Sequence, residues 1–163
     1  MTNTNMLDLL LLQKKDIWEH EDWIVPLSVA LEGLTSEQAA WIPPGGGNSI
    51  WQLVHHMNYY NHELLCHMQN IDPGPRAENN NKTFEYHDSA DHEEQWQQAL
   101  QEIRRLARAI ELELAKWDEI KLQEIRPAGD QTWGQAIARW LPHDAYHAGQ
   151  IVLIRRLQGS WRI

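Results

Sequence analysis

The segment between Asp88 and Trp117 has the most regular apolar pattern in the sequence, with apolar residues alternately four and three positions apart. The residues in this stripe are Trp96, Leu100, Ile103, Ala107, Ile110, Leu114 and Trp117. Because an α-helix turns once in about 3.6 residues, this spacing places them all on one face, and we expect a helix that starts at Asp88 or Ser89. Such a helix must bury its apolar face against other elements, so the pattern predicts a bundle of helices.

Three further segments repeat apolar residues with the period of a helix. The first covers residues 6–34 and contains Pro26, which predicts a kink because proline lacks the N–H that a helix interior needs. The second is expected from about 49 to 70, and the last from about 132 to 158, with a bend caused by Pro142. Together with the segment described above, these give four long helices.

Four long helices and no strand candidate predict an all-α fold, a four-helix bundle. Strand-forming residues are scarce, with a single Phe in the chain. A length of 163 residues, 42% of them apolar, suffices for one core, so we expect a single domain over residues 1–163. The connection from Ile71 to His87 is long enough to run back along a whole helix, which predicts a long connection between helices 2 and 3.

Composition and charge exclude several classes of function. A net charge of −9 argues against a nucleic-acid partner, because an acidic domain repels the phosphate backbone. The longest apolar run, Leu9 to Leu12, is far shorter than the ~20 residues that cross a membrane, and residues 1–5 lack the basic start of a secretory signal. The single cysteine, Cys66, cannot form an internal disulfide, which fits a cytoplasmic location. Cys66 also faces away from the apolar side of its helix, so we do not expect it to be a nucleophile.

Nine histidines occur in this short chain, and two of them stand four residues apart in the last predicted helix. His143 and His147 therefore lie one turn apart on one face, close enough to bind the same metal ion. That face also carries the apolar residues Ala136, Trp140 and Ile151, so both imidazoles are expected to point into the bundle. Either they share a metal there, or they are core histidines that hydrogen-bond to side chains of facing helices.

A third metal ligand would have to come from another helix, and the second predicted helix offers His56. A helical wheel places His56 at the edge of the buried face, whereas His55 and His62 point toward solvent. Two residues on the same edge are candidates for a fourth ligand or for contacts that support the site: Glu63 and His67. Tyr60, also on this edge, is a candidate for a supporting contact or for contact with the substrate. His20 falls on the apolar stripe of the first helix, which makes it a further candidate; the alternative is an ordinary core histidine.

Two segments resemble the signature segments of a known family. The residues 49–56, Ser-Ile-Trp-Gln-Leu-Val-His-His, and 142–151, Pro-His-Asp-Ala-Tyr-His-Ala-Gly-Gln-Ile, are similar to those of the DinB-like superfamily of metal-binding four-helix bundles. The resemblance extends over essentially the whole chain. It implies a divalent metal, zinc or nickel, held by His56, His143 and His147, with a one-residue ambiguity because His55 is adjacent to His56. It also implies a homodimer, which the nine Trp residues would fit.

Family resemblance also implies a type of chemistry, because some relatives are enzymes that use a small thiol such as bacillithiol. Three neutral imidazoles leave a coordination position open, as in catalytic zinc sites. We therefore expect transfer of a low-molecular-weight thiol to an electrophilic small-molecule substrate; the alternatives are a hydrolase that uses metal-bound water and a non-catalytic metal-binding bundle. Asp144 and Gln150 lie within the second segment and are further candidates for the site. Asp144 occupies the position of the base in His-Glu-x-x-His proteases but is one methylene shorter, so protease activity is not expected.

Overall fold

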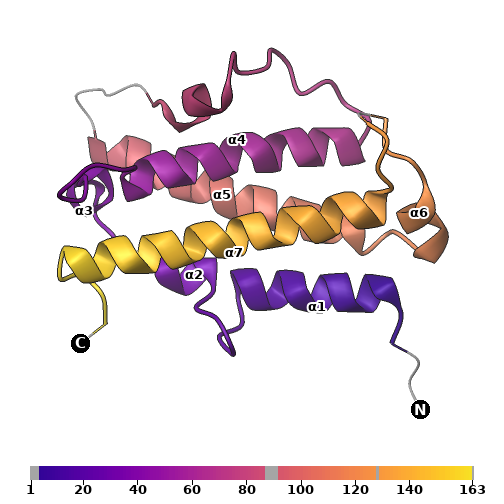
Figure 1. The fold of residues 1–163 in the computed structure, drawn as a ribbon, viewed down its shortest axis with the longest axis horizontal. Coiled ribbons are helices and arrows are strands. Elements are labelled where there is room, and N and C mark those ends of the chain that lie inside the picture. The colour runs from indigo at the N-terminus through magenta and orange to yellow at the C-terminus, as the bar shows by residue number, and fades with distance from the viewer. Residues whose placement is uncertain (1–3, 87–91, 128, 163) are drawn as a thin grey trace.

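The structure, a computed structural model, describes residues 4–86, 92–127 and 129–162. Four long helices form the bundle (Figure 1): α1 (Met6–Trp18), α4 (Ile50–Met68), α5 (His92–Leu114) and α7 (Trp133–Leu157). Four short helical segments lie between them: α2 (Leu27–Ala30), α3 (Ser36–Ala40), the 3₁₀ helix η1 (Asn80–Phe84) and α6 (Glu119–Gln123). The described residues contain an isolated β-bridge, between Ile125 and Thr132, but no strand. The predicted all-α bundle of four long helices is confirmed.

The long connection after α4 determines the direction of the next helix. Figure 1 shows the chain leaving the end of α4 and running back along the bundle to the start of α5. As a result α5 runs parallel to α4, and later residues of α4 contact later residues of α5. Trp51 packs against Trp96 with ring centroids 5.5 Å apart, and the Asn58 side chain donates to the Ala99 carbonyl at 3.1 Å. The predicted long connection is confirmed, and its return course places η1 against α4.

The prediction for the N-terminal segment was wrong. Instead of one kinked helix over 6–34, α1 ends at Trp18 and α2 begins only after Pro26. Pro26 is the N-cap of α2 and has extended backbone angles (φ −71°, ψ 157°), and its ring also disfavours helical geometry in the residue before it. Ile24, which continued the apolar stripe in the sequence, is 40% exposed in the connection. Apolar periodicity therefore continued across a segment in which proline prevents a helix.

The starts of α4 and α7 are fixed by capping side chains, close to where the sequence analysis expected these helices to begin. Ser49 and Thr132 are the N-caps, and each exchanges hydrogen bonds with the glutamine three residues later. Helix α7 does not end at Pro142, although this residue removes one hydrogen bond from the helix interior. The predicted start of the third helix, at Asp88 or Ser89, lies outside the described residues. These caps set the rotation and register of the two helices that carry the histidines.

The stripe that predicted α5 forms one side of a continuous apolar core. Trp96, Ile103 and Leu114 are fully buried in it, and burying a side chain of this size contributes about 1.5–3 kcal/mol. An ion pair also crosses the interface between α1 and α5, where the buried Lys14 ammonium donates to Glu111 at 2.6 Å. No helix in the described part of the chain is both long enough and apolar enough to cross a bilayer.

Candidate metal centre

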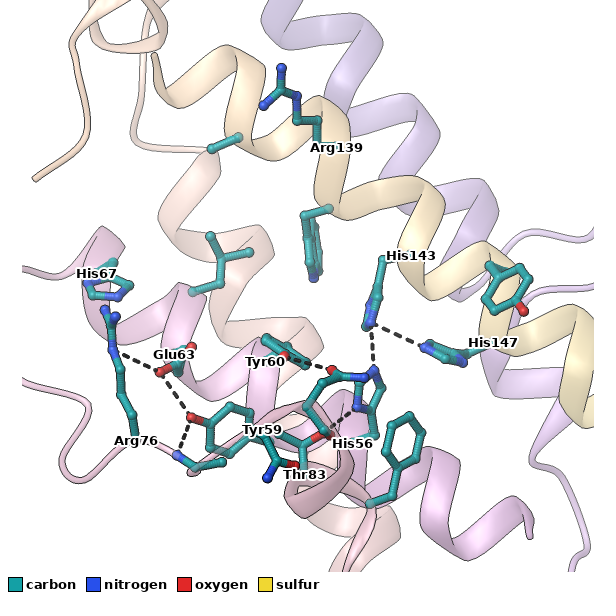
Figure 2. Close-up of a pocket in the computed structure, with 18 of the residues that line it drawn as sticks. His56, Tyr59, Tyr60, Glu63, His67, Arg76, Thr83, Arg139, His143 and His147 are labelled. Atoms are coloured by element: carbon teal, nitrogen blue, oxygen red, sulfur yellow. Dashed lines mark hydrogen bonds and ion pairs between the residues drawn. The ribbon is translucent and has the colours of Figure 1, made fainter. Parts of the chain in front are cut away.

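Three histidines from two helices meet at one point, where α4 and α7 lie side by side. The Nε2 atom of His143 is 3.0 Å from Nε2 of His56 and 3.2 Å from Nε2 of His147 (Figure 2). The cluster takes one ligand atom from each residue, and these atoms all lie within 4.8 Å of one another. His56 and His147 are 4% and 5% exposed, while His143 is partly exposed. The structure therefore brings together the three histidines that the sequence singled out, and His55 is not part of the cluster.

Each of the three imidazoles is held by an oxygen atom on its other nitrogen. His56 Nδ1 lies 2.6 Å from the Thr83 hydroxyl, and His147 Nδ1 lies 2.7 Å from Gln150 Oε1. His143 Nδ1 lies 3.1 Å from Asp144 Oδ1. These three contacts fix the orientation of all the rings, in the way that contacts behind metal-binding histidines commonly do.

The same contacts also determine where the imidazole protons lie. The Gln150 carbonyl and the Asp144 carboxylate can only accept, and the Thr83 hydroxyl already donates to the Asn80 carbonyl at 2.6 Å. All three Nδ1 atoms must therefore carry the proton, which leaves a lone pair on each Nε2. Three converging lone pairs repel one another unless a cation lies between them. In tetrahedral zinc sites the ligand nitrogens are about 3.3 Å apart, close to the two separations from His143 Nε2 given above, and all three ligand atoms lie within 4.8 Å of one another, so the donor set fits a divalent metal.

Burial keeps two of these imidazoles uncharged. Loss of hydration is the main reason why the pKa of His56 is lowered to about 3 and that of His147 to about 4, and neighbouring imidazoles lower both further. Near neutral pH, protons therefore do not occupy these Nε2 atoms. The lone pairs remain available to a metal, for which protons are the usual competitors at histidine ligands.

The residue that holds His143 belongs to a buried polar chain. Asp144 is completely buried; its second oxygen accepts from the Asn61 amide at 3.3 Å, and Asn61 in turn accepts from the Trp140 indole N–H at 2.6 Å. Burial raises the pKa of Asp144, and its hydrogen bonds with His143 and Asn61 act in the opposite direction. Sequence reasoning missed Asn61 as part of the site. The available signal was a polar residue on the apolar face of α4, one turn after Met57.

The long connection supplies two further residues that the sequence prediction missed. Thr83 and Phe84 belong to η1, and the Phe84 ring stacks on His56 with centroids 3.9 Å apart and planes 8° apart. Tyr60, which lies on α4 one turn after His56, meets the His56 ring edge-on with centroids 4.9 Å apart. No periodicity marks Thr83 or Phe84, because their position depends on the path of a connection rather than on a helix face.

A cleft of about 940 Å³ opens beside the three histidines. Tyr60, Glu63 and His67 all line it, although none joins the histidine cluster found in the described residues. Figure 2 shows Glu63 between Tyr59 and Arg76: it accepts from the Tyr59 hydroxyl at 3.2 Å and lies 3.6 Å from the Arg76 guanidinium. These predicted residues therefore contribute to the cleft walls instead of completing the ligand set.

Other residues named from the sequence lie away from the centre. His20 is exposed beyond the end of α1 and contacts Asp16 at 3.3 Å, so its placement on a buried stripe was wrong. The reason is that α1 ends before it. Cys66 is buried, and loss of hydration raises the pKa of its thiol, which is the opposite of what a nucleophile needs. His62 contacts Cys66 on an outer part of α4.

Comparison with known proteins gives a match to a family model. A family model described as the DinB superfamily matches residues 26–151, which include all three clustered histidines and the whole of η1. Neither the curated proteins nor the solved structures gave a match.

Proposed function

This chain belongs to the DinB superfamily, and we propose that it is a metal-dependent enzyme that transfers a low-molecular-weight thiol, such as bacillithiol, to an electrophilic small molecule. One observation supports this above the others: three Nε2 lone pairs converge at the wall of a cleft of about 940 Å³. A cleft of that volume is within the usual range for sites that bind small molecules.

His56, His143 and His147 would hold the metal, which we propose is zinc or nickel because imidazole nitrogen suits both. When bound by three neutral imidazoles, such a cation keeps its charge and an open coordination position, and it lowers the pKa of a thiol that binds there.

The chain's own residues keep the three rings in one arrangement. Thr83, Asp144 and Gln150 each accept an Nδ1–H, so no ring can turn without losing a hydrogen bond. Loss of one such contact typically weakens metal binding about 10–100-fold. Preorganised rings avoid the entropy that flexible ligands would lose on binding.

The cleft walls bring the two substrates together and limit the access of water. Phe84 and Trp140 provide apolar surface in the cleft that also holds the histidines, and Tyr59 and Tyr60 provide hydroxyls. In the reaction, the thiol sulfur forms a bond to an electrophilic carbon, and the leaving group departs with the electron pair of the broken bond. The thiol proton passes to solvent at the cleft mouth, so that atoms and charge balance.

Metal analysis of the purified protein tests the site. We expect about one zinc or nickel per chain in the wild type and in His62→Ala, and loss of metal in His143→Ala. His62 is the matched control because it is a histidine on α4 outside the cluster. Full metal occupancy in His143→Ala would overturn the assignment of the site.

A panel of thiols tests the reaction. With chlorodinitrobenzene as electrophile, the metal-loaded protein should consume at least one thiol among bacillithiol, glutathione and cysteine faster than His143→Ala does. Hydrolysis of ester or amide probes without thiol would favour a hydrolase instead. Inactivity in both assays, in a protein that retains its metal, would favour a non-catalytic bundle.

The proposal includes a homodimer in the cytoplasm, where small thiols are kept reduced. Light scattering measures the dimer directly: a mass near 19.1 kDa would indicate a monomer, and twice that mass the expected dimer.

A further inference from the structure

The cleft has an excess of positive charge, although the chain as a whole has a net charge of −9. Among the described residues, its walls contain three arginines, Arg76, Arg126 and Arg139, and one carboxylate, Glu63. Glu63 lies 3.6 Å from Arg76 and so offsets that charge. Arg126 and Arg139 have no such carboxylate partner in the part of the chain that the structure describes. Two of the arginines that line the cleft therefore have no carboxylate beside them among the described residues.

Arg126 gives a second, independent observation. Its Nε–H is shielded from water and has no acceptor among the described residues. A shielded donor without an acceptor costs free energy, and charged donors cost more than neutral ones. Nε itself is covered by protein, but the Arg126 side chain as a whole is partly exposed in the cleft wall, so its terminal N–H groups can donate to a ligand oxygen there.

These arginines lie at one end of the cleft and the histidines lie farther along it. Figure 1 shows the end of α4 and the start of α7 on the same side of the molecule, and Figure 2 shows Arg76 beside His67 there. At 1.5 Å per helical residue, Arg139 is about 6 Å along α7 from His143, and His67 is about 16 Å along α4 from His56. A ligand anchored at the histidines would reach Arg139 with a group roughly 6 Å away, measured along α7.

We infer that the arginine-lined end binds carboxylates of the thiol substrate while its sulfur lies at the histidines. This inference rests on the proposed function, since that function places the sulfur at the histidines. Guanidinium groups form paired hydrogen bonds with carboxylates, and such bonds are stronger where water is partly excluded. The enzyme should therefore prefer carboxylated thiols to thiols whose polar groups are neutral.

Binding of an unreactive analogue tests this preference apart from catalysis. S-methylglutathione has two carboxylates and no free thiol, and its diethyl ester has the same length without those charges. Calorimetry on the zinc-loaded full-length protein should show the acid bound about a hundredfold more tightly than the ester, because two arginines each form a charge-assisted hydrogen bond worth roughly tenfold. Arg126→Gln and Arg139→Gln should each remove most of that preference.

Arg156→Gln is the matched control, because Arg156 is an exposed arginine on α7 that does not line the cleft. It should retain the wild-type preference, and metal content should be unchanged in all three variants. Equal binding of acid and ester, no binding of either at millimolar concentrations, or a preference that survives Arg126→Gln and Arg139→Gln would each overturn the inference.

Turnover separates this inference from the proposed function. One outcome is that the arginine variants lose the preference for the acid while no thiol is turned over. This outcome would support the anion site and refute thiol transfer. Turnover of thiols without a preference for the acid over the ester would support thiol transfer and refute the anion site. A third comparison uses chlorodinitrobenzoate against chlorodinitrobenzene: if the arginine variants impair only the carboxylated electrophile, the arginines bind the electrophile, and their assignment to the thiol is wrong.

Discussion

Replacing Thr83 with valine removes the hydrogen bond that orients His56 in the metal centre. The same hydroxyl donates to the Asn80 carbonyl at 2.6 Å, and because that bond is lost with and without metal, the difference between the two states isolates the bond to His56. Valine has nearly the same shape as threonine, so the change removes a hydroxyl without opening a cavity. That hydroxyl accepts from His56 Nδ1 at 2.6 Å in a position where His56 is 4% exposed, so water cannot replace it. A buried donor left without an acceptor costs about 1–3 kcal/mol.

The expected magnitude differs between metal-free and metal-loaded protein. Without metal, the His56 imidazole can transfer its proton to Nε2 and donate to His143, 3.0 Å away, which recovers part of the loss. With metal bound, Nε2 is a ligand and the proton must stay on Nδ1, facing the valine methyl group. We therefore expect Thr83→Val to weaken zinc binding about 10–100-fold, which corresponds to about 1.4–2.7 kcal/mol.

Competition with a zinc-binding dye measures the affinity, and calorimetry with and without chelator measures the melting temperature. The melting temperature of the metal-loaded variant should fall by about 2–4 °C for each kcal/mol of stability lost, and that of the metal-free variant should fall by less. Thr83→Ser keeps the hydroxyl and is the control, with affinity close to wild type. Equal losses with and without metal, or a zinc affinity within twofold of Thr83→Ser, would show that the hydroxyl does not act through His56.

Two further predictions concern titration and the buried ion pair. The pKa values of His56 and His147, about 3 and about 4, lie below the unfolded value of 6.5, so protons favour the unfolded chain. Metal-free protein should keep full stability above about pH 6.5 and lose about 2 kcal/mol per pH unit below it, measured by urea unfolding; stability that is constant from pH 7 to 5 would contradict this. Glu111→Ala should lower the free energy of unfolding by about 3 kcal/mol, because Lys14, 1% exposed, keeps a buried charge without this partner. The double variant with Lys14→Met should recover most of that free energy, measured by the same urea unfolding.

The three histidines of the cluster could be predicted from the sequence. His143 and His147 share a helix, so spacing fixes their separation, and the apolar residues around them fix their direction. For His56, the wheel distinguished it from His55 because one residue turns a helix by about 100°, and the structure places His56 in the cluster. Local geometry was enough for these residues because each lies in a regular helix with a clear apolar face.

Residues outside such faces could not be predicted in the same way. Thr83 and Phe84 reach His56 only because the connection after α4 returns along that helix. The prediction for His20 was wrong because it placed this residue on a buried helical stripe, whereas the helix ends at Trp18, before His20. Periodicity measures the spacing of apolar residues, and it contains no information about whether the backbone between them is helical.

The sequence by itself determined the helical class of this protein, the approximate starts of α4 and α7, and the three histidines with their directions. These depend on interactions within about one helical turn, which residue order specifies directly. Tertiary structure alone decided that Thr83 holds the His56 imidazole, that Asn61 contacts Asp144, and which arginines share the cleft with the histidines. Thr83 is 27 residues from His56, and Asp144 is 83 residues from Asn61. Contacts over such separations depend on how the connections run and how the helices pack, and no local pattern specifies either.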